Sequence, residues 1–333
     1  MTIQLTIIGL GQIGSSIGLA LADHADKFTL TGTDIDGKVM QESHKKGAVS
    51  KTTSNINQAV KNADVVILSL PLDQILEMVD MIAPTIKAGA ILLETAPIKG
   101  DIVKRVKDCL PESCSYVGLT PVLNHIYIHN EGYGIATAQA DLFHDGMFGI
   151  ITPPQSNTQA VNFATDFVKL LGANPLFIDL QENDGLMAAT HLLPQLVSIA
   201  MLNSTVDHPG WGEARKVAGR AFAEVTGPAA HLDEAEALKS AVFFSQENIV
   251  RKIDDIIGNL KEIRHEITNN EDEALTSRIA QAKSGVNKWW VERGRGNWTA
   301  VDNPETVTPH YHSDLIGNLF GFGLGRRKKK DEE

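Results

Sequence analysis

The chain has 333 residues, of which 43% are hydrophobic, 21% charged and 6% aromatic. This composition is typical of globular proteins and excludes collagen-like, low-complexity and wholly disordered classes, and the length suits about two domains. Asp and Glu number 41 against 30 Lys and Arg, which gives a net charge of −11. Because such a surface repels a phosphate backbone, we expect a small-molecule substrate and no nucleic-acid partner.

The N-terminal residues 1–10 are apolar but contain no basic region, so no signal peptide is expected. No apolar run approaches the ~20 residues that a membrane span needs. The two cysteines, Cys109 and Cys114, are too few for a disulfide framework. We therefore expect a cytoplasmic protein with reduced thiols and no membrane span.

Short β-branched runs alternate with amphipathic stretches over the first 150 residues. The predicted strands cover residues 5–8, 28–33, 65–70 and 90–93, with later strands at 116–118 and 148–151, and a helix is predicted over 13–22. Apolar runs of this length, separated by helices, predict a parallel sheet that is covered on both faces. We expect a doubly wound α/β domain over residues 1–152.

The pattern changes after Pro153 and Pro154, which mark a predicted domain boundary. Residues 187–202 are apolar nearly all round, as in a helix that is buried within a domain or at a dimer interface. Residues 235–266 carry apolar side chains at helical spacing, with charges on the other side. We expect residues 153–293 to form an all-helical dimerisation domain, and hence a homodimer.

The last segment, residues 294–333, is expected to be an extended tail. It contains a glycine-rich apolar stretch over 315–324 and a basic run over 326–330 that acidic residues follow. A solvated terminus is expected, and contact with acidic lipid or with the acidic body of the protein is the alternative. His310 and His312 flank Tyr311, but this motif lacks supporting carboxylates, so no metal site is expected.

A G-x-G-x-x-G motif, residues 9–14, follows the first predicted strand and opens the first predicted helix. Gly9 permits the tight turn and Gly11 lets the backbone approach a pyrophosphate. Gly14, which follows Gln12 and Ile13, lets the helix lie close to the strand. The helix N-terminus offers free N–H groups to the phosphates. This context predicts a Rossmann-like, dinucleotide-binding domain.

Asp34 ends the second predicted strand, 20 residues after the motif. A carboxylate at this place accepts hydrogen bonds from the adenosine ribose and repels the extra phosphate of NADP. Residues 35–37 include no Arg, so NAD is expected over NADP. Leu70 and Pro71 end another predicted strand and Thr95 follows the next one. We expect these residues to flank the nicotinamide at the carboxyl edge of the sheet.

Residues 9–17 resemble the opening of the prephenate and arogenate dehydrogenases of tyrosine biosynthesis. The resemblance covers residues 3–265 in consistent order and continues at 70–71, 89–100, 183–189, 193–194 and 248. It implies a nucleotide-binding domain and a helical dimerisation domain with the active site between them. It also implies hydride transfer from the hydroxyl-bearing ring carbon to the nicotinamide, with loss of carbon dioxide. In that family a histidine polarises the hydroxyl and an arginine binds a substrate carboxylate.

The chain differs from this family at the positions of its reactive groups. The family's Gly-His-Pro histidine falls on Thr120, and the serine of its Gly-Ser-Val-Lys loop falls on Pro97. Its two further histidines fall on Leu192 and Gln195. The arginines of its Phe-Arg-Asp-x-Thr-Arg stretch fall on Ala223 and Gly227. The scaffold and the cofactor site are therefore expected to be kept, and the prephenate-specific groups to be altered or lost.

Other side chains are candidates to replace those groups. His191 lies one residue before the family's histidine position, about 100° away on a regular helix. A threonine hydroxyl needs help to act as a base near neutral pH. The candidate catalytic residues are His191, Thr120 and His125, with His129 as a further source of an imidazole. Arg215 and Arg220 are the nearest candidates to bind a carboxylate, and a place on the helix surface is the other interpretation of both.

The expected function is that of an NAD(P)-dependent oxidoreductase resembling prephenate dehydrogenase. Its substrate would be prephenate, arogenate or a related cyclic or hydroxy acid. The first alternative is an NAD-binding sensor or regulatory protein, which the altered positions favour. The second is a dehydrogenase of β-hydroxy acids, for which Lys216 and Lys239 are the interior candidates for a catalytic lysine.

Overall fold

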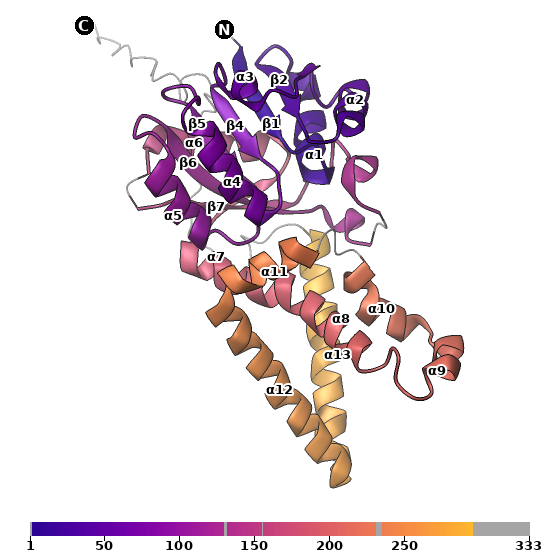
Figure 1. The fold of residues 1–333 in the computed structure, drawn as a ribbon. Coiled ribbons are helices and arrows are strands. Elements are labelled where there is room, and N and C mark those ends of the chain that lie inside the picture. The colour runs from indigo at the N-terminus through magenta and orange to yellow at the C-terminus, as the bar shows by residue number, and fades with distance from the viewer. Residues whose placement is uncertain (1, 130–131, 155, 231–234, 296–333) are drawn as a thin grey trace, which may run out of the picture.

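The computed structural model describes residues 2–129, 132–154, 156–230 and 235–295. They form a sheet-bearing part and a helical part that lies against one end of it (Figure 1). The sheet has the strand order β3-β2-β1-β4-β5-β6-β7-β8. Its strands are β1 (Ile3–Ile8), β2 (Phe28–Thr33), β3 (Lys51–Thr52), β4 (Val65–Leu68), β5 (Ile91–Glu94), β6 (Ser115–Val122), β7 (Met147–Ile151) and β8 (Asn174–Phe177).

The first six strands are parallel, which confirms the predicted doubly wound sheet. Leu5 of β1 lies beside Leu30 of β2 on one side and Val65 of β4 on the other, so the strand order reverses at β1. In such sheets ligands bind outside the carboxyl ends of the strands at the reversal. One edge departs from the prediction, because β7 runs antiparallel to β6 and β8 then runs parallel to β7.

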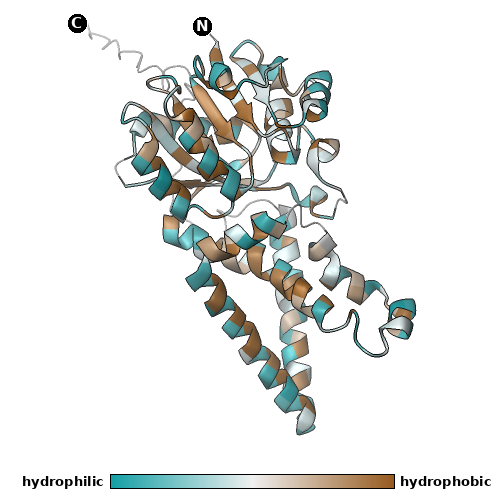
Figure 2. Cartoon of the chain, viewed as in Figure 1, coloured by the Kyte–Doolittle hydropathy of each residue, from teal (hydrophilic) through white to brown (hydrophobic). Residues whose placement is uncertain are grey.

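Helices cover both faces of the sheet because its central strands are apolar on both sides. Val65 and Ile67 point to one core cluster, and Val66 and Leu68 point to the other. The first face carries α1 (Gln12–Ala20), α2 (Gly37–Lys45) and α6 (Thr158–Leu170), and the second carries α3 (Ile56–Val60), α4 (Leu72–Ile82) and α5 (Gly100–Cys109). Figure 2 shows the strands as a hydrophobic layer between these helices.

Helix α6 and strand β8 follow the predicted boundary at residue 152 and belong to the sheet-bearing part. Phe163 and Phe167 of α6 are fully buried in the first core cluster, and β8 pairs with β7. The sheet therefore ends at Phe177. The sequence did not reveal β8 because it is a half-exposed edge strand that contains Pro175, a residue that sheets accept at their edges.

The helical part begins at Leu180 with two helices that join through a π-helical turn. Its helices are α7 (Leu180–Met187), the π-turn (Ala188–Leu192), α8 (Leu193–Asn203), α9 (Trp211–Val217), α10 (Arg220–Ala230), α11 (Ala235–Phe244), α12 (Gln246–Thr268) and α13 (Asp272–Arg295). The long helices α12 and α13 project from the body, meet at the tip where the chain turns and spread apart toward the body (Figure 1). Arg278 of α13 joins them by ion pairs to Glu262 and Glu266, at 2.9 and 2.7 Å.

One helix differs from the expectation that no segment resembles a membrane span. In the described part of the chain, the stretch Leu180–Asn203 is long and apolar enough to meet the length and composition test for a span. The same stretch contacts α10 and α12 of the helical part. Residues 296–333 lie outside the described residues, and with them the histidines 310 and 312 and the basic run 326–330.

We expect Phe163→Ala to lower the free energy of unfolding by about 3–5 kcal/mol, because it leaves a cavity in the core under the sheet. Phe177→Ala on β8 is the matched control, since that ring is 59% exposed, and its cost should be far smaller. Urea denaturation followed by circular dichroism measures both. Equal, small costs would contradict the assignment of α6 to the core of the sheet-bearing part.

Candidate functional site

A cleft of about 780 Å³ lies between the sheet-bearing part and the helical part. The sheet-bearing part contributes the start of α1 and the segments that follow β4 and β5, and the helical part contributes the π-turn, α8 and α11. The lining residues predicted from the sequence are Gly11, Gln12, Ile13, Leu70, Pro71, Thr95 and His191. The structure therefore brings six of the nine predicted cofactor residues and one predicted catalytic residue to one cavity, whereas Gly9, Gly14 and Asp34 lie outside its lining.

The glycine turn at the floor of the cleft leaves no room for side chains at two positions. Gly9 has φ +92°, and a Cβ there would lie 2.2 Å from the carbonyl oxygen of Ser69. A Cβ on Gly14 would lie 2.0 Å from the carbonyl oxygen of Gly9. Gly11 instead faces open space. It precedes α1, which has no side-chain cap and no acidic residue in its first turn, so its N–H groups are free to bind an anion.

Asp34 lies beside this turn, just after the end of β2. Its Oδ2 accepts a hydrogen bond from the backbone N–H of Leu10 at 2.8 Å, and its Oδ1 accepts one from Asp36 at 2.9 Å. These bonds hold the carboxylate next to the first residues of the turn. Each carboxylate oxygen thus accepts one backbone N–H, and Asp34 is not among the residues that line the cleft.

His191 reaches the cleft from the π-turn. The N–H of Leu193 donates to the carbonyl of Ala188, five residues earlier, and Pro194 has no N–H to continue regular pairing. The side chain of Gln195 donates to the carbonyl oxygen of His191 at 2.8 Å. A π-turn changes the direction of the side chains that follow it, which regular helical spacing does not predict.

The His191 side chain is exposed and lies at the wall of the cleft. Desolvation by the neighbouring protein lowers the pKa of its imidazole below the usual 6.5, because it disfavours the protonated form. The ring is therefore neutral at neutral pH. A neutral imidazole can accept a hydrogen bond or a proton from a substrate hydroxyl.

The other candidate catalytic residues lie outside the residues that line the cleft. Thr120 is buried in β6, and its hydroxyl donates to Asn183 Oδ1 at 3.0 Å. His125 is half-buried at the start of the short 3₁₀ turn His125–Tyr127. His129 is exposed and stacks on the Trp290 ring with centroids 5.2 Å apart. Of these side chains and His191, His191 alone lines the cleft.

The candidate cations of the helical part are exposed and lie away from the lining. Arg215 is exposed on α9, and the Arg220 side chain is 90% exposed on α10, where it binds Glu224 at 2.8 Å. Lys216 and Lys239 were expected in the interior, but both are exposed and paired with Glu213 and Glu236. These ion pairs join residues three or four apart on one helix, which is typical of a solvated helix face.

The lysine that is buried is Lys99, whose burial the sequence did not reveal. Its ammonium lies 2.7 Å from Glu94 Oε1 and donates to the carbonyl of Leu119 at 2.8 Å. The Tyr116 hydroxyl donates to the same Glu94 oxygen at 2.9 Å. Both charged side chains are fully buried. Desolvation raises the pKa of Glu94 and lowers that of Lys99, and their mutual attraction opposes both shifts.

The described residues that line the cleft include no Lys, Arg, Asp or Glu. The polar side chains among them are Gln12, Ser69, Thr95, Tyr133, His191 and Gln195. The rest of the lining is apolar or glycine. The cleft can therefore bind a ligand by neutral hydrogen bonds and apolar contact.

Comparisons with known proteins agree with this geometry. The family model of the prephenate dehydrogenase nucleotide-binding domain matches residues 17–176. A cyclohexadienyl dehydrogenase of Zymomonas mobilis is 23% identical over 84% of this chain and 94% of that protein. A prephenate dehydrogenase of Bacillus subtilis is 24% identical over 84% of this chain and 74% of that protein.

A solved structure shows the same fold. The prephenate dehydrogenase of A. aeolicus in complex with hydroxyphenyl propionate and NAD+ has a TM-score of 0.77 at 17% identity, over 86% of this chain and 98% of that one. The matched family region ends one residue before the last residue of β8, in agreement with the observed end of the sheet. The resemblance stated from the sequence is thereby confirmed, because most of the sheet-bearing part matches the model of the prephenate dehydrogenase nucleotide-binding domain.

Proposed function

We propose that the chain is an NAD-dependent dehydrogenase that oxidises the hydroxyl-bearing carbon of a small cyclic hydroxy acid, with prephenate and arogenate as the first substrates to test. The observation that carries the proposal is the shared cleft. The glycine turn, Leu70 and Pro71, Thr95 and a neutral His191 all line it. The two free thiols, Cys109 and Cys114, support the expected cytoplasmic location.

The sheet-bearing part would hold the cofactor. The free N–H groups at the start of α1 would bind the pyrophosphate, with Gly11 allowing its close approach. Asp34 would accept hydrogen bonds from the ribose and disfavour the additional phosphate of NADP. Bound NAD supplies the hydride acceptor. Leu70, Pro71 and Thr95, which follow β4 and β5 and line the cleft, would face the nicotinamide of NAD.

The helical part would supply the group that polarises the substrate. His191, neutral in the cleft, would accept the hydrogen bond of the substrate hydroxyl and take its proton as the hydride leaves. A substrate carboxylate would be bound by neutral donors such as Thr95 and Gln195, because the described lining offers no cation. The second candidate function is an NAD-binding protein without turnover. The absence of a cation from the described lining favours it, as do Ala223 and Gly227 at the positions where the resemblance places the family's arginines.

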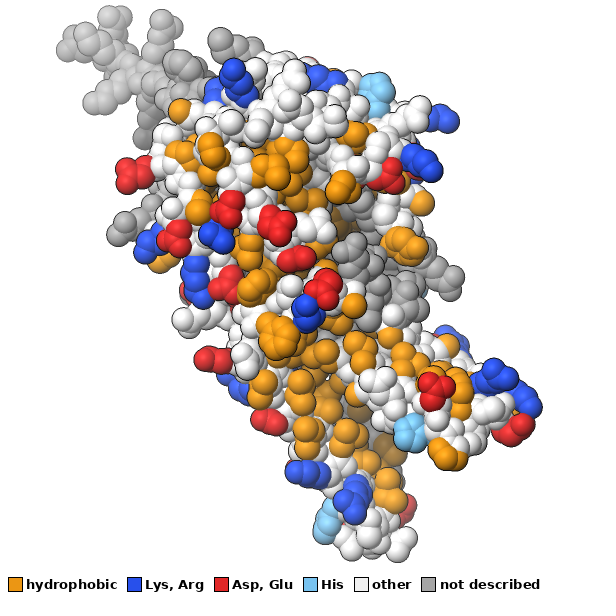
Figure 3. All heavy atoms as spheres, viewed as in Figure 1, with side chains coloured by type: hydrophobic (Ala, Val, Ile, Leu, Met, Phe, Trp, Pro, Cys, Tyr) orange, Lys and Arg blue, Asp and Glu red, His pale blue; other side chains and the backbone are white. Residues whose placement is uncertain are grey.

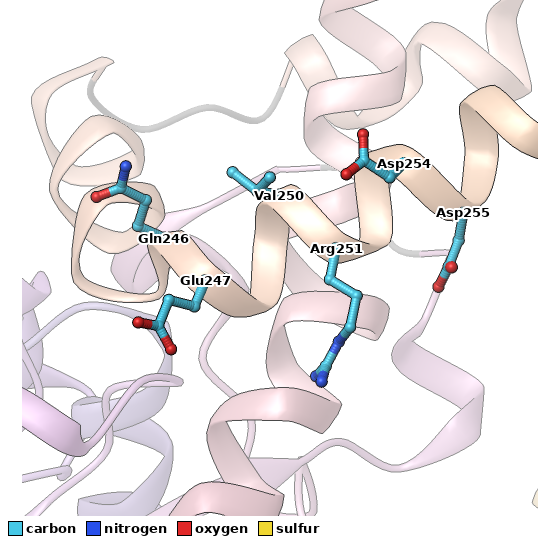
Figure 4. Close-up of a pocket in the computed structure, with 6 residues that line it drawn as sticks. All are labelled: Gln246, Glu247, Val250, Arg251, Asp254 and Asp255. Atoms are coloured by element: carbon cyan, nitrogen blue, oxygen red, sulfur yellow. The ribbon is translucent and has the colours of Figure 1, made fainter.

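We further propose that the helical part forms a homodimer. Within the described chain, several large apolar side chains of α12 and α13 are exposed, among them Val250 (48%), Leu260 (59%) and Ile279 (60%). Figure 3 shows apolar side chains gathered over the helical part. A hollow of about 570 Å³ beside α12 is lined by six residues of that helix, of which Val250 alone is apolar (Figure 4). The exposed apolar side chains of α12 and α13 are typical of an interface, and a second copy would cover them.

Calorimetry should show that the purified chain binds NAD more tightly than NADP. When prephenate is added to the chain with NAD, the absorbance of the reduced cofactor should rise. Asp34→Ala should weaken NAD binding, because it removes the ribose acceptor. NAD binding without turnover across a panel of cyclic and linear hydroxy acids would favour the second candidate function. A folded chain with no affinity for either coenzyme would exclude both functions.

We expect log kcat/KM to fall as the pH is lowered through the pKa of His191, which lies below 6.5. The sign follows because protonated imidazole cannot accept the substrate proton. His191→Asn should lower kcat by about 10²-fold or more and remove this acidic limb. The control is His208→Asn, which replaces an exposed histidine of the helical part and should leave the dependence of kcat/KM on pH unchanged. An unchanged acidic limb in His191→Asn would exclude His191 as the base.

Sedimentation equilibrium should give the mass of two chains for the unmodified protein. Leu260→Glu places a charge on the exposed apolar face of α12 and should shift the equilibrium to one chain, because burying an unpaired carboxylate is unfavourable. Gln58→Glu adds the same charge at an exposed position of α3 and should leave the mass unchanged. A single-chain mass for the unmodified protein would contradict the dimer.

A further inference from the structure

Residues 95–97, which line the cleft, are held from below by the sheet-bearing part. The N–H of Ala96 donates to Glu94 Oε2 at 2.7 Å. The buried ammonium of Lys99 donates to the carbonyl of Ala96 and is paired with Glu94. These bonds fix the first half of the segment to β5 and to the start of α5.

The same segment is held from the other side by two neighbouring residues of α7. Asn183, which is fully buried, donates its Nδ2 to the carbonyl of Pro97 at 3.0 Å. Asp184 accepts the N–H of Lys99 at 2.8 Å and the N–H of Gly100 at 2.9 Å, one on each carboxylate oxygen. The helical part thus contacts residues 95–97 at Pro97, and it contacts Lys99 and Gly100 just beyond them.

Asp184 acts as the cap of a helix in the other part of the molecule. Helix α5 begins at Gly100, and its own N-cap residue, Lys99, makes no side-chain capping bond. A carboxylate at a helix N-terminus satisfies free N–H groups and interacts favourably with the helix dipole. Asn183 also connects α7 to strand β6, because its Oδ1 accepts a hydrogen bond from the hydroxyl of Thr120.

We propose that Asn183 and Asp184 are positioning residues that hold residues 95–97 against the nicotinamide half of NAD. This inference rests on the proposed NAD site. Neither side chain lines the cleft, so they act through Thr95, Ala96 and Pro97. The pair also sets where the helical part, with His191 on the following turn, lies relative to the cofactor. The adenine half is bound elsewhere, at the glycine turn and Asp34.

The test compares the affinities of NAD and ADP-ribose, which lacks the nicotinamide, by calorimetry. Asp184→Ala should weaken NAD binding about tenfold, the effect of one or two charge-assisted hydrogen bonds, and ADP-ribose binding less than about twofold. Gly100→Ala is an independent variant, because its Cβ would lie 3.0 Å from Asp184 Oδ2 and displace the carboxylate. Its effect should have the same direction. Asp101→Asn, on the first turn of α5 and paired with Lys104, is the control and should change neither affinity.

Thermal unfolding of each variant shows whether it is folded, and Gly100→Ala serves as the deciding variant if Asp184→Ala does not fold. Equal weakening of both ligands, or no weakening of either, would overturn the positioning role while leaving the NAD site in place. An unmodified protein that binds neither ligand would overturn the proposed function and this inference with it.

Discussion

The close approach of the glycine turn to the end of β4 is the constraint on which the cleft depends. A side chain at Gly9 would collide with the carbonyl of Ser69, and one at Gly14 would collide with the carbonyl of Gly9. Only without these side chains can α1 begin directly beside the residues that follow β4. The free N–H groups of α1 and the segment at Leu70 then face the same space, which is the requirement for binding the two halves of one dinucleotide.

The charges of this region lie beneath the cleft and not within it. Glu94 and Lys99 are fully buried under residues 95–97, whereas the described lining carries neutral polar groups. Burying two ions has a desolvation penalty of several kcal/mol per ion, so such a pair is weak evidence for stability. Its geometry has a clearer consequence: both charged groups bind Ala96. The pair therefore fixes the backbone of a segment that would face the reactive end of the cofactor.

The sequence predicted those features that depend on local pattern. Strand β2 spans the predicted residues 28–33, and Gly11, Leu70 and Thr95 line one cleft. Features that depend on distant contacts were not predictable. Lys99 is buried because Gly118, opposite Glu94 on β6, leaves room for the pair, since a Cβ there would lie 3.1 Å from Glu94 Oε1. Strand β8 was not predicted, because a short run that contains Pro175 does not by itself indicate a strand.

The candidate histidines show how backbone irregularity decides which side chain reaches a site. His125 follows Thr120 by five residues, yet it lies outside the cleft lining, while His191 reaches the cleft from the helical part. Pro194 interrupts regular pairing, and the π-turn before it places His191 where spacing along a regular helix would not. Thr120, which the sequence resemblance places at the family's histidine position, donates to Asn183. Strand β6 therefore contributes to the contact between the two parts, and the proposed base, His191, would come from the helical part.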